Sequence, residues 1–371
     1  MIKCGADEHR WRGLDRAEPL FSPTDVGENA NVSLPVYNNA YLPKKHCAAT
    51  QCYQIQQHTS PRKVLHLFTR QLFFAILMPE CGSKTVWNSH LRCLRRNRMK
   101  KFEGLLFCTD LDGTLYSDDK TVSKQNLDAI EYFKSEGGLF TFITGRVPAT
   151  SKDICSIIDP NAPYGCLNGG GIYDVRKNKY LWTATLPGDF IELVKEVDMQ
   201  LPQIGIQLNT EDKVYFCKSN AAMVHFRAVT GLPNLACRFA DVEEPVLKVV
   251  FAHTDEKQIL DLIDLLNSHP KARNFDFIRS ERTLYEILPK GVSKGAVLCK
   301  MAELLGIDMR KTIAVGDYNN DVSMIKAAGM GFAVANAVEE AKDVAAHITV
   351  SNNEHAISAI IDGLDRRIYS I

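Results

Sequence analysis

The last three quarters of the chain alternate short apolar runs with helical patterns. Short apolar runs, each interrupted by at most one threonine, occupy residues 105–108, 139–143 and 312–315, and polar or turn residues follow each of them. Short runs of this kind are typical of strands buried in a parallel sheet. Between the first two runs, apolar residues recur at helical spacing over residues 127–133. The strand–helix–strand order predicts a parallel βαβ unit and an α/β fold.

The pattern changes between residues 187 and 283. Amphipathic helices are predicted around residues 190–197 and 259–266, and residues 204–208 alternate like a half-exposed strand. Helices mixed with alternating strands indicate an α+β insert whose sheet has one open face. We therefore predict a core domain formed by residues 99–186 and 284–371, with residues 187–283 as an inserted domain.

The first 98 residues differ from the rest of the chain in hydrophobic pattern and in charge. They lack sustained periodicity and carry 14 Lys and Arg against 7 Asp and Glu, so the neutral chain divides into a basic first part and an acidic remainder. Met99 stands just before the first predicted strand, as a natural start would. We hypothesise that residues 1–98 are a non-native extension from a mis-assigned start; the alternative is a genuine extension that is disordered or accessory.

Composition narrows the class of protein. The chain has 11 cysteines, an odd number with no CxxC pair, which favours buried free thiols in a reducing, cytoplasmic compartment. No apolar run reaches 18 residues, so no membrane-spanning helix is expected. The basic cluster near residue 95 is typical of a solvated arm, and no nucleic-acid partner is expected.

Two carboxylates follow the first predicted strand. Asp110 and Asp112 are separated by one residue, and Gly113 indicates that the chain turns there, so both carboxylates can line one small pocket. Open α/β sheets bind ligands at the carboxyl ends of their strands. Two carboxylates this close repel each other, and a divalent cation would relieve the repulsion.

Other strand ends add polar groups to the same predicted rim. Thr144-Gly145-Arg146 follows the second strand. The Thr144 hydroxyl could donate a hydrogen bond to a phosphate, and Gly145 would let the backbone approach it closely. Taken without the other motifs, the three residues could equally cap the next helix. Asp317 and Asp321 follow the strand at 312–315, and their oxygens suit Mg²⁺ better than zinc. Lys294 falls in the first turn of a predicted helix, against the helix dipole, so it needs an anionic partner.

Residues 103–367 resemble the haloacid dehalogenase (HAD) superfamily of phosphotransferases. The four motifs occur in order as DLDGT at residue 110, TGR at residue 144, Lys294, and GDYNND at residue 316. The position of the insert resembles the C2-type cap of the Cof-like (IIB) phosphatases, as does Asn168-Gly169-Gly170. The resemblance implies a Rossmann-like parallel core with an inserted α+β cap domain.

The resemblance also implies a role for each motif residue. Asp110 would be the nucleophile, Asp112 the general acid and base, and Lys294 a group that neutralises the phosphoryl oxygens. Mg²⁺ would be held by the Asp110 and Asp317 carboxylates and the Asp112 backbone carbonyl, with Asp321 in the same metal site. The phosphate and substrate would contact a set drawn from the other motifs: Thr144, Gly145, Arg146, Asn168 and Asn320.

The expected function is a Mg²⁺-dependent phosphatase acting through an aspartyl-phosphate. Members of the family that the sequence resembles act on sugar phosphates, pyridoxal phosphate and flavin mononucleotide. The resemblance therefore implies a small phosphate ester as the substrate. A phosphomutase of the same superfamily and a non-catalytic binding or regulatory protein stay open as alternatives. The protein is expected to be a monomer or a homodimer without a membrane partner.

Overall fold

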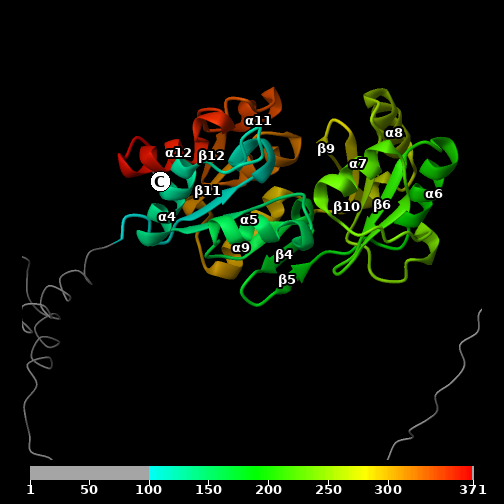
Figure 1. Cartoon of the computed structure of the whole chain (residues 1–371), viewed down its shortest axis with the longest axis horizontal. Helices are drawn as coiled ribbons and strands as arrows, with labels where there is room; N and C mark the ends of the chain where they lie inside the picture. Colours follow the sequence, from blue (N-terminus) through cyan, green and yellow to red (C-terminus); the bar gives the residue numbers. More distant parts are fainter. Residues whose placement is uncertain (1–99, 370–371) are drawn as a thin grey trace, which may run out of the picture. The chain divides into compact units, whose positions relative to one another are not determined.

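Strand β1 (Leu106–Thr109) lies between β11 and β2 in a five-stranded parallel sheet, in the order β13-β12-β11-β1-β2. The computed structural model (Figure 1) describes residues 100–369. Phe107 stands opposite Phe140 on one side and Ile313 on the other, so the carboxyl ends of β2, β1 and β11 meet at one edge, which we call the carboxyl edge. The other strands of this sheet are β2 (Leu139–Phe142), β11 (Thr312–Gly316), β12 (Met330–Ala333) and β13 (His347–Ile348).

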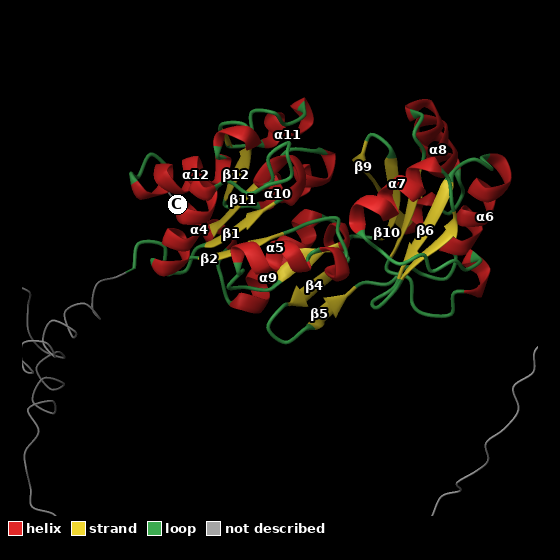
Figure 2. Ribbon diagram, viewed as in Figure 1, coloured by secondary structure: helices red, strands yellow, loops and turns green. Residues whose placement is uncertain are grey.

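Helices cover both faces of this parallel sheet (Figure 2). Phe107 packs in one apolar cluster with residues of α4 (Lys124–Ser135) and α12 (Ala356–Asp365). Its neighbour Cys108 belongs to a second cluster with residues of α9 (Lys294–Leu305) and α10 (Val322–Ala327). Successive residues of a strand point to opposite faces, so a continuous apolar run is what a strand buried on both faces requires. The short helix α11 (Glu339–Val344) follows β12.

A small antiparallel sheet continues from the end of β2. A single bridge between Ile143 and Gly165 joins the two sheets, and the strand order is β3-β4-β5. Its elements are β3 (Tyr164–Cys166), β4 (Gly171–Asp174) and β5 (Lys179–Thr183), and α5 (Lys152–Ile158) precedes them. The Gly-rich turn predicted around residue 169 therefore connects two strands near the carboxyl edge.

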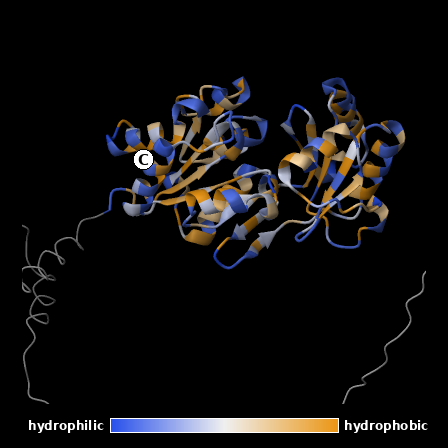
Figure 3. Ribbon diagram, in the orientation of Figure 1, coloured by the Kyte–Doolittle hydropathy of each residue, from blue (hydrophilic) through white to orange (hydrophobic). Residues whose placement is uncertain are grey.

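The inserted domain is built on a second five-stranded sheet, antiparallel, in the order β7-β6-β8-β10-β9, which we call the cap sheet. Helices α6 and α8 pack on one face through an apolar cluster that includes Leu193, Val249 and Leu262. Figure 3 shows apolar residues concentrated along the strands, with many hydrophilic residues on the outer helices. The elements are α6 (Phe190–Gln200), β6 (Gly205–Asn209), β7 (Val214–Lys218), α7 (Ala221–Thr230), β8 (Lys248–Ala252), α8 (Glu256–Ser268), β9 (Phe275–Glu281) and β10 (Leu284–Pro289).

The α/β core with an inserted α+β domain confirms the predicted fold class, but one boundary differs. The sequence-based boundary at residue 283 places Leu284–Pro289 with the core, whereas this strand pairs with β8 and β9 in the cap sheet. An apolar strand does not indicate which sheet it joins, because either sheet would bury it. We place the end of the cap after Pro289.

Two other expectations concern the first 98 residues and membrane-spanning helices. The hypothesis about residues 1–98 lies outside the described residues. Among the helices of residues 100–369, none is long and apolar enough to cross a membrane.

Gly169 tests how tightly the Gly-rich turn is packed against the core. Its φ is +103°, and a Cβ there would lie 2.2 Å from the carbonyl oxygen of Ser293. We expect Gly169→Ala to lower the free energy of unfolding by about 3 kcal/mol, because backbone strain and overpacking add. Gly188→Ala is the matched control, since a Cβ at Gly188 meets nothing within 4 Å. Equal urea midpoints for the two variants would contradict this expectation.

Candidate active site

The carboxyl edge brings together residues from three adjacent strands. Asp110 directly follows β1, and its backbone N–H donates to the Val315 carbonyl (2.9 Å), which continues the ladder to β11. On the other side, the backbone N–H of Ile143 donates to the carbonyl of Thr109 (2.9 Å), so Thr144 comes next on that side. Asp317 directly follows β11. The parallel register thus gathers side chains that are far apart in the sequence.

Lys294 lies between two carboxylates. Its Nζ donates to Oδ1 of Asp110 (2.5 Å) and to Oδ1 of Asp321 (2.6 Å), and all three side chains are buried. It is the first residue of α9, which Ser293 caps by accepting a hydrogen bond from the backbone N–H of Ala296. Two carboxylates are therefore the anionic partners that the position of Lys294 predicts. Burial alone lowers the pKa of Lys294, but the two carboxylates outweigh it and raise the pKa.

Asp110, Asp317 and Asp321 form an acidic cluster. One carboxylate oxygen of each lies within 4.8 Å of the others. Burial and the charge of Asp321 raise the pKa of Asp110 well above its usual range, and the same two causes raise the pKa of Asp317 to about 7. Lys294 alone does not balance three carboxylates. A hard divalent cation with oxygen ligands would balance the charge, so the donor set fits Mg²⁺.

The turn after Asp110 fits closely around Asp317. Gly113 has φ of +81°, and a Cβ at this position would lie 2.5 Å from Oδ2 of Asp317. The next residue, Thr114, donates its hydroxyl hydrogen to Oδ1 of Asp317 (2.9 Å). Asp321 accepts the backbone N–H groups of Asp317 and Tyr318 on Oδ2 (3.0 and 3.1 Å). With Lys294 on its other oxygen, Asp321 is well placed to orient its neighbours.

Asp112 faces different partners from Asp110. Arg146 donates to both of its oxygens, from Nε at 2.9 Å and Nη2 at 2.8 Å, and Lys120 Nζ lies 3.2 Å from Oδ1. Burial by itself raises the pKa of Asp112, but the hydrogen bonds and charge of Arg146 prevail and hold it below its usual value. The Asp112 carboxylate is not part of the acidic cluster. Metal binding by the backbone carbonyl of Asp112 stays a prediction.

The remaining predicted residues form a second group on the same edge. Thr144 is buried, and its hydroxyl accepts the backbone N–H of Arg146 (3.2 Å). Asn320 donates through Nδ2 to Oδ1 of Asn168 (3.0 Å), and Asn168 in turn donates to Glu286 of the cap sheet (2.9 Å). Their part in phosphate binding stays a prediction.

Gly145 also belongs to this second group, through its backbone. Its carbonyl accepts a hydrogen bond from Lys248 of the cap sheet (3.0 Å). A Cβ at this position would lie 3.0 Å from Oδ1 of Asn168, so the backbone passes close to that side chain. The predicted close approach of the Thr144–Arg146 segment is therefore made to Asn168, and an approach to phosphate stays a prediction.

Four residues with clear positions at this edge have no role in the sequence interpretation. Thr114 stands in the DLDGT motif, where a hydroxyl directly after the turn glycine is a usable signal. Lys248 and Glu286 are single charged residues inside otherwise apolar strands, which is unusual enough to mark them. Lys120 lies in a polar loop and carries no such signal.

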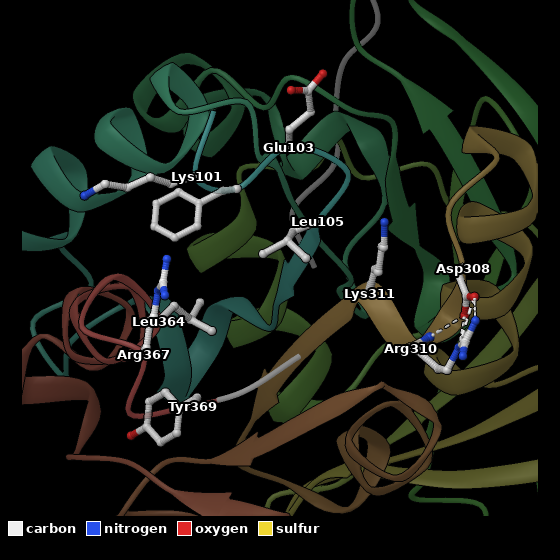
Figure 4. A pocket seen from close by; sticks show the side chains of 10 residues that line it. Lys101, Glu103, Leu105, Asp308, Arg310, Lys311, Leu364, Arg367 and Tyr369 are labelled. Atoms are coloured by element: carbon white, nitrogen blue, oxygen red, sulfur yellow. Dashed lines mark hydrogen bonds and ion pairs between the residues drawn. The ribbon is translucent and has the colours of Figure 1, made fainter. Parts of the chain in front are cut away.

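A pocket of about 490 Å³ lies elsewhere in the core (Figure 4). Leu105 and Lys311, which line it, directly precede β1 and β11, so this pocket belongs to the opposite, amino-terminal edge of the parallel sheet. Lys101, Arg310 and Arg367 also line it. None of the predicted site residues contributes to this pocket.

The motifs and their geometry agree with the comparison to known families. Residues 107–361 match the haloacid dehalogenase-like hydrolase family, and the chain belongs to this family. The resemblance stated from the sequence is thereby confirmed.

Relatives and solved structures cover the same part of the chain. A putative phosphatase of Bacillus subtilis, YxeH, is 29% identical over 278 residues, which are 70% of this chain and 97% of the relative. The 5-amino-6-(5-phospho-D-ribitylamino)uracil phosphatase YwtE of the same organism is 27% identical over 280 residues, 69% and 96% of the two chains. A haloacid dehalogenase-like hydrolase from Bacteroides thetaiotaomicron superposes with a TM-score of 0.61 at 24% identity, covering 71% of this chain and 99% of that one. The HAD subclass IIB sugar phosphatase BT4131 gives 0.63 at 19%, covering 70% and 99%.

Lys294 offers a direct test of the charge balance. In Lys294→Met, Asp110 and Asp321 are left as buried carboxylates without a cation. We expect the free energy of unfolding in EDTA at neutral pH to fall by roughly 3–5 kcal/mol, measured by urea denaturation. The control is Lys124→Met, which breaks an exposed pair with Asp128 and changes stability by less than about 1 kcal/mol. A Lys294→Met midpoint equal to that of the control would show that the pair does not balance the cluster.

Proposed function

We propose that the protein is a Mg²⁺-dependent phosphatase that hydrolyses small phosphorylated metabolites through an aspartyl-phosphate on Asp110. The observation that carries the proposal is the buried Lys294 between Asp110 and Asp321, at the edge where the motif residues of a HAD-like hydrolase converge. Both sequence relatives described above are named phosphatases, YxeH as a putative one, which supports the same reaction class.

Asp110 is the proposed nucleophile because only one of its oxygens is engaged by Lys294. The other oxygen, Oδ2, attacks phosphorus, the bond from phosphorus to the leaving alcohol oxygen breaks, and the phosphoryl group passes to the carboxylate. Lys294 offsets the repulsion between this carboxylate and the anionic phosphate. Stabilising charge on the transferring group supplies most of the rate enhancement in phosphoryl transfer.

Asp112 is the proposed acid and base. It protonates the leaving alcohol and then takes a proton from the water that hydrolyses the aspartyl-phosphate. A carboxylate bound at both oxygens by Arg146 stays ionised. The proposal therefore requires that Asp112 loosen its contact with Arg146 when substrate binds, after which the guanidinium is free to contact the phosphate.

The metal site would be formed by the carboxylates of Asp110 and Asp317 and the backbone carbonyl of Asp112. Bound there, Mg²⁺ would neutralise phosphoryl oxygens and orient the ester for attack. Thr114 holds one oxygen of Asp317, and Asp321 fixes the backbone of the same turn, so the ligands are oriented in advance. Asp321 would act through these contacts, since hydrogen bonds already engage both of its oxygens.

The substrate is proposed to be a small phosphate ester of the sugar phosphate, pyridoxal phosphate or flavin mononucleotide type. Helices α6 and α8 cover one face of the cap sheet, and α7 packs on part of the other face through Met223. The rest of that second face contacts the core through Lys248 and Glu286, and we propose that the leaving group binds beside it. The oligomeric state, the lack of a nucleic-acid partner and the cytoplasmic location stay predictions.

Phosphate release tests the reaction. The wild type should release inorganic phosphate from at least one ester of a panel containing p-nitrophenyl phosphate, sugar phosphates, pyridoxal phosphate and flavin mononucleotide, with Mg²⁺ and not with EDTA. Asp110→Asn should lower kcat at least about 1,000-fold, because the amide cannot take up the phosphoryl group. Asp128→Asn makes the same change on an exposed helix and should leave kcat unchanged. No release from any ester, or equal rates for wild type and Asp110→Asn, would overturn the proposal; transfer to a sugar dependent on a bisphosphate activator would indicate a mutase.

Metal binding has a readout that does not depend on turnover. Mg²⁺ at 100 times its dissociation constant should stabilise the folded wild type by about 2.7 kcal/mol, seen as a rise in Tm. Asp317→Asn should remove this rise, because it removes a proposed ligand while Thr114 can still contact its side chain. Asp128→Asn serves again as the control and should keep the rise. A Tm of the wild type that is insensitive to Mg²⁺ would contradict the metal site.

A further inference from the structure

The cap sheet carries a buried ion pair on the face opposite α6 and α8. Lys248 of β8 and Glu286 of β10 lie 2.8 Å apart, with 5% and 3% of their side chains exposed. Their sequence neighbours Val249 and Ile287 belong to the apolar cluster beneath α6 and α8. Successive strand residues alternate between faces, so Lys248 and Glu286 point to the other face.

Both members of the pair reach into the core domain. Lys248 Nζ donates to the carbonyl of Gly145 (3.0 Å), and Glu286 Oε2 accepts from Nδ2 of Asn168 (2.9 Å). Asn168 is bonded in turn to Asn320 (3.0 Å), in the loop that carries Asp317 and Asp321. The second oxygen of Glu286 accepts from the Ser280 hydroxyl (2.7 Å), so both oxygens are engaged.

Stability alone gives a weak reason for such a pair. Taking two charges out of water costs several kcal/mol per ion, and replacing a buried pair by neutral groups of similar shape is often without cost. What the charged pair adds here is a fixed contact to one backbone carbonyl. Gly145 lies between Thr144, which follows β2 at the carboxyl edge, and Arg146, which donates to both oxygens of Asp112.

We propose that Lys248 and Glu286 are positioning residues for the reaction. Lys248 holds the Thr144–Arg146 segment through the Gly145 carbonyl, and Glu286 holds Lys248 and, through Asn168, the loop of Asn320. The cap sheet thereby fixes two segments of the active site from outside it. This inference rests on the proposed phosphatase function and concerns residues that do not themselves touch phosphate.

A pair of variants separates positioning from stability. Lys248→Met leaves Glu286 charged and unpaired, and should lower the urea midpoint. Lys248→Met/Glu286→Gln removes both charges and keeps an acceptor for Asn168, so its midpoint should return close to that of the wild type. Its kcat with p-nitrophenyl phosphate should stay about 100-fold low with little change in KM, because the Gly145 carbonyl remains unheld.

Hydrogen exchange gives a second readout that needs no activity. Backbone amides of residues 144–146 should exchange at least about 10-fold faster in the double variant than in the wild type, because the segment loses its contact to the cap. The matched control, Lys213→Met/Glu244→Gln, removes an exposed ion pair on the cap and should alter neither kcat nor exchange. A double variant with wild-type kcat and wild-type exchange would overturn this inference alone, whereas a wild type that releases no phosphate from any ester would overturn the proposed function.

Discussion

The arrangement of the carboxyl edge depends on one buried contact, in which the ammonium group of Lys294 lies between the carboxylates of Asp110 and Asp321. Each of these groups would be costly to bury without the others, because an isolated charge loses its hydration. The contact also joins three segments that are far apart in the sequence: the end of β1, the start of α9 and the turn after β11. At the same junction Asp317 is positioned by Thr114 and by the Asp321 carboxylate. Three carboxylates against one ammonium group leave the excess of negative charge that suits a divalent cation.

Much of the core is predictable from the sequence because its signals are local. Short apolar runs predict buried parallel strands, and the polar residues directly after them must then share an edge. The helical spacing of apolar residues 127–133 predicts the helix found at residues 124–135, and Ser123 caps it by accepting the backbone N–H of Asn126. Lys294 is the clearest case, since an unfavourable position against a helix dipole is enough to predict an anionic partner.

The parts that escape prediction depend on contacts between distant segments. Strand β10 cannot be assigned to the cap from its residues, because pairing partners are chosen by the whole sheet and leave no mark on an apolar strand. The contact of Arg146 with both oxygens of Asp112 is equally hidden, since the TGR motif indicates a loop and not the direction of a long side chain. Lys248 and Glu286 stand out as charges in apolar strands, but only the register of β8 and β10 shows that they meet.

The route by which the chain leaves the cap has a mechanical consequence. Strand β10 ends at Pro289 and α9 begins at Lys294, so only residues 290–293 separate the cap sheet from the lysine. A connection this short cannot isolate one rigid body from the other. A movement of the cap sheet would be transmitted through residues 290–293 to the backbone of Lys294, and would therefore change the contacts of this lysine with Asp110 and Asp321.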